Sequence, residues 1–315
     1  MKAPRSVISG GTGYVGRFIA ENLLDAGHRV VVLGRNAPPE NFFSSPVRYV
    51  PFSLGDEEVT HSLFEGADFF VHCAFDHVPG RYRGGEGGDP EAFRRRNIDG
   101  SVALFSAAKA AGVKRAVFLS SRAVYGRRPP GEWLAETDEP HPDTLYGIVK
   151  LEAEKALERL CGPGFQGISL RVTGVYGPAG AGLPHKWSGL FADYLSGEQI
   201  DPRVGTEVHG DDVADAVRLV LERGTIDETL LNVSDLIVDR REILAILKRK
   251  SGASHSLPAA GNRSAINQMR TDRLRALGWR PGGFELLQRT IAALCRMYDK
   301  SVIEQLISQN VSPAS

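Results

Sequence analysis

The sequence carries no excess of charge of either sign, because its 38 Lys and Arg residues balance its 38 Asp and Glu residues. A chain without net charge has no global field that would favour nucleic acid or an anionic membrane surface. It also lacks any uncharged apolar run that approaches the roughly 18 residues needed to span a bilayer. We therefore expect neither a nucleic-acid partner nor a membrane partner.

Cysteine is scarce as well. Cys73, Cys161 and Cys295 are far apart and odd in number, so their spacing predicts neither a disulfide framework nor a metal site. Residues 1–9 run directly into an expected strand and a glycine-rich turn, which leaves no room for a cleavable signal peptide. These absences favour a cytoplasmic protein with three reduced thiols.

The residues that are present favour an α/β fold. Short, nearly continuous apolar runs indicate strands that are buried on both faces, as in a parallel sheet. The expected strands are residues 6–8, 29–33, 47–50, 68–72, 116–119 and 167–172. The helices expected between them are residues 14–26, 57–65, 91–111 and 144–161. This alternation predicts a doubly wound parallel sheet of the Rossmann type, which binds ligands beyond the carboxyl ends of its strands.

The alternation of strands and helices breaks after residue 174. The elements expected there are helices 186–196, 211–222 and 240–251, a short strand 231–233, and a mostly helical tail over 262–307 that is interrupted at 278–283. We predict a Rossmann domain over 1–174 with returns near 206–235. A smaller C-terminal lobe, which would bind substrate, then comprises 175–205 and 236–315.

A glycine-rich turn follows the first expected strand and opens the first expected helix. Gly10, Gly13 and Gly16 have the spacing G-x-x-G-x-x-G. Such a turn brings backbone N–H groups close to a pyrophosphate at a helix N-terminus, and its last glycine lets the helix pack closely on the strand. Because a strand precedes the motif and a helix follows it, the sequence predicts a dinucleotide-binding domain.

The end of the second expected strand bears on which dinucleotide is bound. A carboxylate there would bond a free ribose 2′-hydroxyl, but Gly34 and Arg35 offer a guanidinium and no acid. The alternative interpretation of Arg35 is an exposed loop residue. The pattern favours NADP(H), with NAD(H) as the alternative cofactor.

A Tyr-x-x-x-Lys pair lies at the start of the helix expected over 144–161. The spacing puts the side chains of Tyr146 and Lys150 on one helical face. A phenol with a pKa of ~10 is a poor base near neutrality, and an adjacent ammonium lowers that pKa. Ser121 stands at the carboxyl end of the fifth expected strand, where its hydroxyl could share a bond to a substrate oxygen with Tyr146.

Taken in order, these motifs resemble those of the extended short-chain dehydrogenase/reductase family, in its NAD(P)-dependent epimerase/dehydratase group, over about residues 5–300. The matching segments are residues 10–16, 72–74, 97–100, 120–126, 146–150, 171–178, 209–214 and 277–281. The resemblance implies that Ser121, Tyr146 and Lys150 are the catalytic triad, with Tyr146 as proton donor or acceptor. It also implies a homodimer built on helices 91–111 and 144–161, although burial in the core explains the same apolar positions.

The resemblance also implies a set of cofactor contacts. The predicted set is Gly10, Thr12, Gly13, Tyr14, Val15, Gly16, Arg35, Ser53, Leu54, Ala74, Phe75, Asn97, Tyr146, Lys150, Val172 and Thr173. Ser53 stands where the family has Asp beside the adenine, and this weakens one expected contact to the adenine amino group.

The chain departs from relatives that act on nucleotide-linked sugars. Those enzymes hold the substrate's diphosphate with an Asn and an Arg, and this chain has Gly174 and Gly205 at the two positions. The loss of both anchors argues for a smaller or less phosphorylated substrate. Arg81, Arg83 and Arg122 are the predicted substrate contacts, and the first two equally fit a solvated flexible loop.

The sequence therefore predicts an NADP(H)-dependent oxidoreductase that transfers hydride between the nicotinamide and a small hydroxy or keto compound, a class that includes sugar derivatives. One alternative is an epimerase of sugars or sugar nucleotides that keeps its cofactor bound. A dehydratase ranks last, because Arg122-Ala123 stands where such enzymes carry an acidic pair. An alternative of another class is a sensor or scaffold that binds NADP(H) without turnover.

Overall fold

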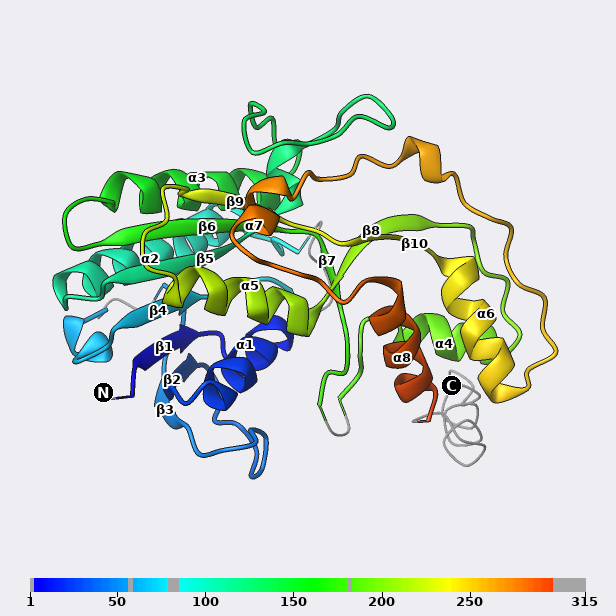
Figure 1. Ribbon diagram of the computed structural model, residues 1–315, viewed down its shortest axis with the longest axis horizontal. Coiled ribbons are helices and arrows are strands. Elements are labelled where there is room, and N and C mark those ends of the chain that lie inside the picture. The colour runs from blue at the N-terminus through cyan, green and yellow to red at the C-terminus, as the bar shows by residue number, and fades with distance from the viewer. Residues whose placement is uncertain (1–2, 56–58, 79–84, 181–182, 297–315) are drawn as a thin grey trace.

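A seven-stranded parallel sheet, in the order β3-β2-β1-β4-β5-β6-β9, forms the main body of the molecule (Figure 1). The computed structural model describes residues 3–55, 59–78, 85–180 and 183–296. The strands of this sheet are β1 (Arg5–Ser9), β2 (Arg29–Gly34), β3 (Arg48–Pro51), β4 (Phe69–His72), β5 (Arg115–Ser121), β6 (Gln166–Val172) and β9 (Leu230–Val233). Their buried positions are mostly Val, Ile, Leu and Phe, as strands covered on both faces require. The predicted doubly wound parallel sheet is confirmed.

Helices cover both faces of this sheet (Figure 1). They are α1 (Tyr14–Asp25), α2 (Pro90–Ala110), α3 (Leu145–Leu160) and α5 (Gly210–Glu222). α1 and α5 share one apolar core with Ile8, whereas α2 and α3 share another with Val7. Because adjacent residues of a strand point to opposite faces, one strand supplies side chains to both cores.

A smaller lobe is built around a second sheet of three strands, in the order β10-β8-β7. Its strands are β7 (Gly174–Tyr176), β8 (Val204–His209) and β10 (Leu236–Asp239), and its helices are α4 (Ser188–Leu195), α6 (Arg240–Ser251) and α8 (Gly283–Cys295). The core of this lobe contains Tyr176, Phe191, Leu244 and Ile291. Figure 1 shows the lobe beyond the carboxyl ends of the parallel strands, so the two bodies meet where ligands bind in such folds. The smaller lobe was predicted, and the division at residue 174 stays a prediction.

The sequence did not predict the second sheet. β7 is three residues long, and β8 pairs parallel to β7 but antiparallel to β10. Strands this short carry little periodicity, so their pairing depends on the two neighbours that tertiary folding brings together.

The prediction of a helix over 57–65 was wrong for residues 59–65, which the structure describes. Only a single 3₁₀ turn, η1 (His61–Phe64), forms there, and Thr60 before it has extended backbone. Val59 and Thr60 are β-branched, which disfavours helix. Residues 56–58 lie outside the described residues.

The tail from residue 262 is less helical than expected. It contains η3 (Arg263–Ala265), α7 (Asp272–Ala276) and α8. Between η3 and α7 the backbone pairs with Leu134 instead, which donates to Gln268 and accepts from Arg270. These bonds satisfy the backbone without a helix. Residues 297–315 lie outside the described residues, and no helix among the described ones is long and apolar enough to cross a membrane.

Candidate active site

The glycine-rich turn after β1 is tight, and at Gly10 and Gly16 it leaves no room for a side chain. Gly10 has a positive φ of 73°, and a Cβ on it would lie 2.7 Å from the backbone nitrogen of Ala74. A Cβ on Gly16 would lie 2.2 Å from the carbonyl oxygen of Gly10. α1 begins at Tyr14, so its first N–H groups face this turn without helical partners. This arrangement fits a dinucleotide pyrophosphate at a helix N-terminus, as the sequence predicted.

Other predicted cofactor residues of this turn have different surroundings. The hydroxyl of Tyr14 donates to the carbonyl oxygen of Gly177, 2.7 Å away, and so ties the turn to the segment after β7. Val15 packs against the core beneath the sheet. The hydroxyl oxygen of Thr12 lies 3.2 Å from the position that a Cβ of Gly34 would take, so Thr12 reaches the end of β2.

Arg35 follows β2 and has a partner that sequence reasoning missed. Its guanidinium lies 3.7 Å from a carboxylate oxygen of Asp76, and Arg96 contacts the other oxygen of that carboxylate at 2.5 Å. The side chain of Arg35 is 63% exposed, so it faces solvent at the mouth of the candidate cofactor site. The three charges sum to one positive charge.

Asn97 acts on the loop after β4. Its amide oxygen accepts the N–H of Asp76 at 2.8 Å, and its amide nitrogen donates to the carbonyl oxygen of Asp76 at 2.9 Å. Asn97 thereby fixes the segment that carries Ala74 and Phe75. Of the two residues expected near the adenine, Leu54 is buried in the core, whereas Ser53 is half-buried.

His72 and Cys73, at the end of β4, are held in uncharged forms. The His72 ring lies between the hydroxyls of Ser9, at 2.6 Å, and Ser101, at 2.8 Å. Burial, reinforced by the charge of Lys150, lowers the pKa of His72 to about 3. Burial raises the pKa of the Cys73 thiol to about 12. Both groups are therefore supports of the site rather than acids or bases at neutral pH.

Tyr146 and Lys150 lie in the first two turns of α3, as predicted. The helix starts at Thr144, whose hydroxyl accepts the N–H of Gly147 at 3.1 Å. The ring of Tyr146 packs edge-on against Phe75, with 5.0 Å between ring centroids. The structure therefore brings together Phe75 from the cofactor set and Tyr146 from the proposed triad.

The Lys150 ammonium is buried next to Tyr146. It lies 5.9 Å from the ring centre of Tyr146 and donates to the carbonyl oxygen of Leu119 at 2.7 Å. It also lies 4.5 Å from the ring centre of Phe75. Burial lowers its pKa to about 8, against the opposing charge of Glu154. An ammonium with this pKa remains mostly protonated at neutral pH, so it can stabilise negative charge on a neighbouring phenol oxygen.

Ser121 ends β5 beside the end of β6. Its oxygen accepts the N–H of Ala123 at 3.1 Å, which leaves the hydroxyl proton to be donated elsewhere. Val172, from the cofactor set, is the register partner of Ser121. Thr173 turns toward the second sheet, where its hydroxyl donates to the carbonyl oxygen of Thr206 at 2.8 Å.

A buried ion pair connects α3 to β6. Glu154, two turns after Tyr146, binds Arg171 of β6 at 2.8 Å and accepts a bond from Ser120. The Arg171 guanidinium also lies 4.6 Å from the ring centre of Tyr125. This pair joins α3 to β6 one helical turn after Lys150. Its sequence signal is the spacing of four residues between Lys150 and Glu154 on one helical face.

The predicted substrate contacts are placed unequally. Arg122 donates to the carbonyl oxygen of Asn267 at 3.3 Å, so its side chain leads from the end of β5 toward the C-terminal segment. Arg81 and Arg83 lie outside the described residues. Trp187, near the start of α4, is 6% exposed and stacks on Tyr176. Trp187 thus belongs to the core of the smaller lobe.

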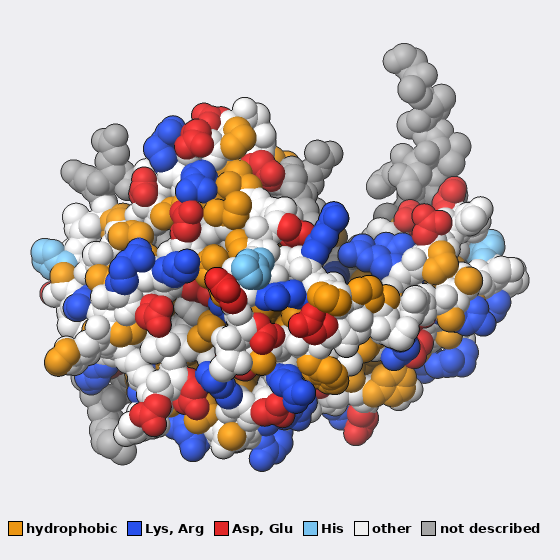
Figure 2. Space-filling model, turned by 90° about the horizontal axis from the view of Figure 1, so that it is seen from above, with side chains coloured by type: hydrophobic (Ala, Val, Ile, Leu, Met, Phe, Trp, Pro, Cys, Tyr) orange, Lys and Arg blue, Asp and Glu red, His pale blue; other side chains and the backbone are white. Residues whose placement is uncertain are grey.

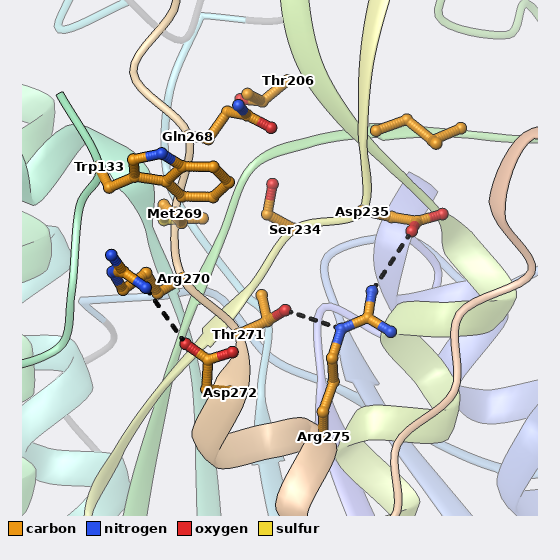
Figure 3. A pocket seen from close by; sticks show the side chains of 11 residues that line it. Trp133, Thr206, Ser234, Asp235, Gln268, Met269, Arg270, Thr271, Asp272 and Arg275 are labelled. Carbon is orange, nitrogen blue, oxygen red and sulfur yellow. Dashed lines mark hydrogen bonds and ion pairs between the residues drawn. The ribbon is translucent and has the colours of Figure 1, made fainter. Parts of the chain in front are cut away.

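A pocket of about 250 Å³ opens beside this C-terminal segment (Figure 3). Trp133, Thr206, Ser234 and residues 268–272 line it, together with Asp235, Leu236 and Arg275. Figure 3 shows its charges paired with one another, Arg270 with Asp272 and Arg275 with Asp235. Neighbouring residues of a strand face opposite sides, so this pocket lies on the other side of β8 from Glu207.

The two glycines that replace the family's anchors flank a charged pair. Lys186 and Glu207 form an ion pair, and a Cβ on Gly174 would lie 2.3 Å from the Lys186 nitrogen and 2.7 Å from a Glu207 oxygen. The other Glu207 oxygen lies 3.6 Å from the position of a Cβ on Gly205. Sequence reasoning missed Glu207, because an acidic residue within an unrecognised strand carries no distinct signal.

Comparison with known proteins gives one family. The sequence profile of the NAD-dependent epimerase/dehydratase family matches residues 6–233. A UDP-glucose 4-epimerase of Lacticaseibacillus casei is 30% identical over 65% of this chain and 62% of its own length. A dTDP-6-deoxy-L-talose 4-dehydrogenase (NAD(P)(+)) of Kitasatospora kifunensis is 34% identical over 61% of this chain and 58% of its own length. The chain thus spans about three fifths of the length of these curated relatives.

The fold has the same relatives. The crystal structure of a UDP-glucose 4-epimerase from Thermus thermophilus, in complex with NAD, superposes with a TM-score of 0.74 at 28% identity. The match covers 93% of this chain and 99% of that chain. The predicted resemblance and the predicted enzyme class, an NAD(P)-dependent oxidoreductase or epimerase, are confirmed at the level of the family.

Proposed function

The chain belongs to the NAD-dependent epimerase/dehydratase family, and on that premise we propose that it is an NADP(H)-dependent oxidoreductase acting on a small hydroxy or keto compound derived from a sugar. The observation that carries this proposal is the grouping of Ser121, Tyr146 and the buried Lys150 at the carboxyl end of the sheet, with Phe75 packed against the tyrosine. A protein that only binds the cofactor has no need of this trio.

The proposed roles follow from the chemistry of the three side chains. When bound, NADP(H) would accept or donate hydride at C4 of its nicotinamide. Tyr146 would move the proton of the substrate oxygen, and Ser121 would donate its free hydroxyl proton to that same oxygen. Lys150 would favour the phenolate of Tyr146 by its charge.

The proposed preference for NADP(H) rests on charge at the end of β2. No carboxylate ends that strand, and Arg35 and Arg96 outnumber the single carboxylate of Asp76 that they share. A ribose 2′-phosphate would therefore meet net positive charge, and guanidinium groups suit phosphate geometry. The remaining predicted cofactor contacts belong to this same proposal.

Binding constants test this preference. We expect NADP⁺ to bind at least ~10-fold more tightly than NAD⁺, and Arg35→Ala to lose at least ~10-fold of NADP⁺ affinity, as expected for loss of a charged hydrogen bond. Arg29→Ala, at the opposite end of the same strand, is the matched control and should leave both constants unchanged. A tenfold preference of the wild-type protein for NAD⁺ would overturn the proposal.

Turnover is tested by absorbance of the reduced nicotinamide against a panel of sugars, aldonolactones and simple ketones. Net oxidation or reduction of one of them supports the proposed reaction. The second candidate function is epimerisation, which the UDP-glucose 4-epimerase relative favours. Copurified cofactor together with an inverted product and no net change of absorbance would favour the epimerase instead.

We also propose a homodimer in the cytoplasm. α2 and α3 lie side by side on one face of the sheet (Figure 1), and Val102 of α2 and Leu151 of α3 remain half-buried there. A second copy would cover these positions. Sedimentation of the purified protein at twice the mass of one chain is the expected result, and sedimentation as a monomer at micromolar concentration would refute it.

A further inference from the structure

The ion pair of Lys186 and Glu207 is more exposed than the pair of Glu154 and Arg171. Its side chains are 30% and 12% exposed, against 7% and 3% for the deeper pair. Lys186 precedes α4 in the smaller lobe, and Glu207 is in the middle of β8. The pair therefore reaches solvent from within the smaller lobe.

Strand register relates this pair to the candidate triad. Val172 is the register partner of Ser121, and Gly174 follows Val172 by two residues. At about 3.3 Å per residue, this places Gly174 within a sugar ring's length beyond the end of β6. Gly174 is in turn the register partner of Glu207. Figure 2 shows the surface hollowed between the main body and the smaller lobe, with Lys and Arg side chains at the edge of the hollow.

Glycine at two positions lets the carboxylate of Glu207 take this place. The carboxylate lies beside the Cα atoms of both Gly174 and Gly205, and side chains there would contact it. Those contacts would be with the movable ends of Lys186 and Glu207, so the glycines permit this arrangement of charges and do not by themselves impose it. An anionic group thus occupies the space between the two glycines.

The chemistry of this pair suits hydroxyl groups. A carboxylate accepts hydrogen bonds from hydroxyls, an ammonium donates to them, and the two together satisfy adjacent hydroxyls of one ring. A diphosphate would find no net positive charge here, because Lys186 and Glu207 balance one another, and its oxygens cannot donate a hydrogen bond to the Glu207 carboxylate. The positive charge of Arg203 also attracts the Glu207 carboxylate. The Arg203 side chain is exposed, however, so solvent screens this attraction.

We propose that Glu207 and Lys186 form a specificity subsite that binds hydroxyl groups of an uncharged, polyhydroxylated substrate and excludes nucleotide-diphosphate sugars. This inference rests on the proposed function and names its substrate class. Discrimination here comes from the lack of net positive charge and from two facing groups that only accept hydrogen bonds, the carboxylate and the diphosphate, as well as from attractive contacts.

The first test measures binding of UDP, the diphosphate probe, by calorimetry at low salt, with and without saturating NADP⁺. Glu207→Gln keeps the size of the side chain and removes its charge, and we expect it to bind UDP at least fivefold more tightly than the wild-type protein does. Lys186→Met should bind UDP no more tightly than wild type. Glu285→Gln, an 81% exposed carboxylate on α8, is the control for net charge and should change the constant less than twofold. A gain below fivefold for Glu207→Gln, including no detectable binding, would overturn the proposal.

The second test uses the neutral sugars and aldonolactones that the wild-type protein turns over. Glu207→Gln should raise KM for them at least tenfold and change kcat less than threefold, because the subsite binds the substrate away from the reacting carbon. An unchanged KM would overturn hydroxyl recognition. Failure of the proposed function would show as absence of NADP⁺ binding. The UDP binding constants of wild type and Glu207→Gln can still be compared on cofactor-free protein, so the two failures are distinguishable.

Discussion

Two residues of the candidate site show how single positions matter. Gly10 matters because it has no side chain, and Lys150 matters because its charge is buried. Gly10 is needed because its φ is positive and its neighbour Ala74 stands where a Cβ would be. Lys150 acquires a pKa of about 8 because α3 buries its ammonium against Leu119 and aromatic rings. The residue types were visible in the sequence, but the packing that gives Lys150 this pKa was not.

Replacement of Tyr146 by Phe removes one oxygen and keeps the ring that packs on Phe75. We expect kcat to fall at least ~100-fold, because general acid–base catalysis contributes about that much. The binding constant for NADP⁺, measured by fluorescence titration, should change far less than kcat does, because the ring is kept. Turnover within tenfold of wild type would refute the role of Tyr146.

Gly10→Ala should abolish cofactor binding at concentrations that saturate the wild-type protein, because its Cβ would lie 2.7 Å from the backbone of Ala74. The control is Gly27→Ala, which has a comparable φ of 81° and nothing within 4 Å of its Cβ. It should lose about 1 kcal/mol of stability from backbone strain alone and bind NADP⁺ normally. Equal binding of NADP⁺ by both variants in calorimetry would contradict the assignment of the glycine turn as the cofactor site.

At the scale of elements, α3 holds the triad because it is fixed at two points. Thr144 caps its start, and Glu154 binds Arg171 of β6 two turns after Tyr146. The sequence predicted α1, α2, α3, α5 and α6 within about two residues of their ends, since long amphipathic patterns and caps are local signals. It missed β7, β8 and β10, because strands of three to six residues form only when neighbours offer backbone partners.

Glu154→Gln leaves the charge of Arg171 buried without its partner. We expect the free energy of unfolding in urea to fall by about 3–5 kcal/mol, the usual effect of breaking a buried pair. Glu152→Gln is the control, because Glu152 pairs with Arg94 at 2.9 Å where both side chains are over a third exposed. Its effect should stay below about 1 kcal/mol. Equal losses for the two variants would show that the deeper pair has no special role.

Asp212 links α5 to the start of α8 by accepting the N–H of Gly282 at 3.0 Å. Burial, the largest cause, raises its pKa to about 7, with the nearby carboxylates of Asp235, Asp215 and Asp211 acting in the same direction. Between pH 4 and pH 7 the folded protein therefore holds a proton that the unfolded chain has released. The contribution of Asp212 to stability is thus favourable at low pH and is lost as the pH rises through this window.

Asp212→Asn removes this titration and keeps an acceptor for Gly282. We expect its stability relative to wild type to improve by at least about 1 kcal/mol between pH 4 and pH 7. Asp272→Asn, at an 80% exposed position, should show no such trend. Unfolding by urea across this pH range measures the difference, and parallel curves for wild type and Asp212→Asn would refute a raised pKa.

At the scale of the whole molecule, the main body and the smaller lobe meet at the carboxyl ends of the parallel strands (Figure 1). Tyr14 of α1 already bonds the segment after β7, so cofactor bound at the glycine turn is coupled to the smaller lobe. Ligand that binds only the folded chain stabilises it by mass action. At a concentration of 100 times its Kd, NADP⁺ should add about 2.7 kcal/mol to the free energy of unfolding.

Thermal unfolding with increasing NADP⁺ measures this stabilisation. We expect a single transition that moves upward as a whole, because both bodies share the contact through Tyr14. Gly10→Ala should abolish the shift. Two unfolding transitions, of which only one responds to the cofactor, would contradict coupling of the smaller lobe to the main body.

The sequence by itself determined the parallel sheet, the helices that cover it, the glycine turn and the candidate triad. These features rest on local patterns: apolar runs, helix caps, glycines and a spacing of four residues. The tertiary structure decided the second sheet, the Arg35–Asp76–Arg96 group and the placement of Glu207 between Gly174 and Gly205. Each of these joins residues distant in the chain, and burial and charge pairing act only once the fold has brought such residues together.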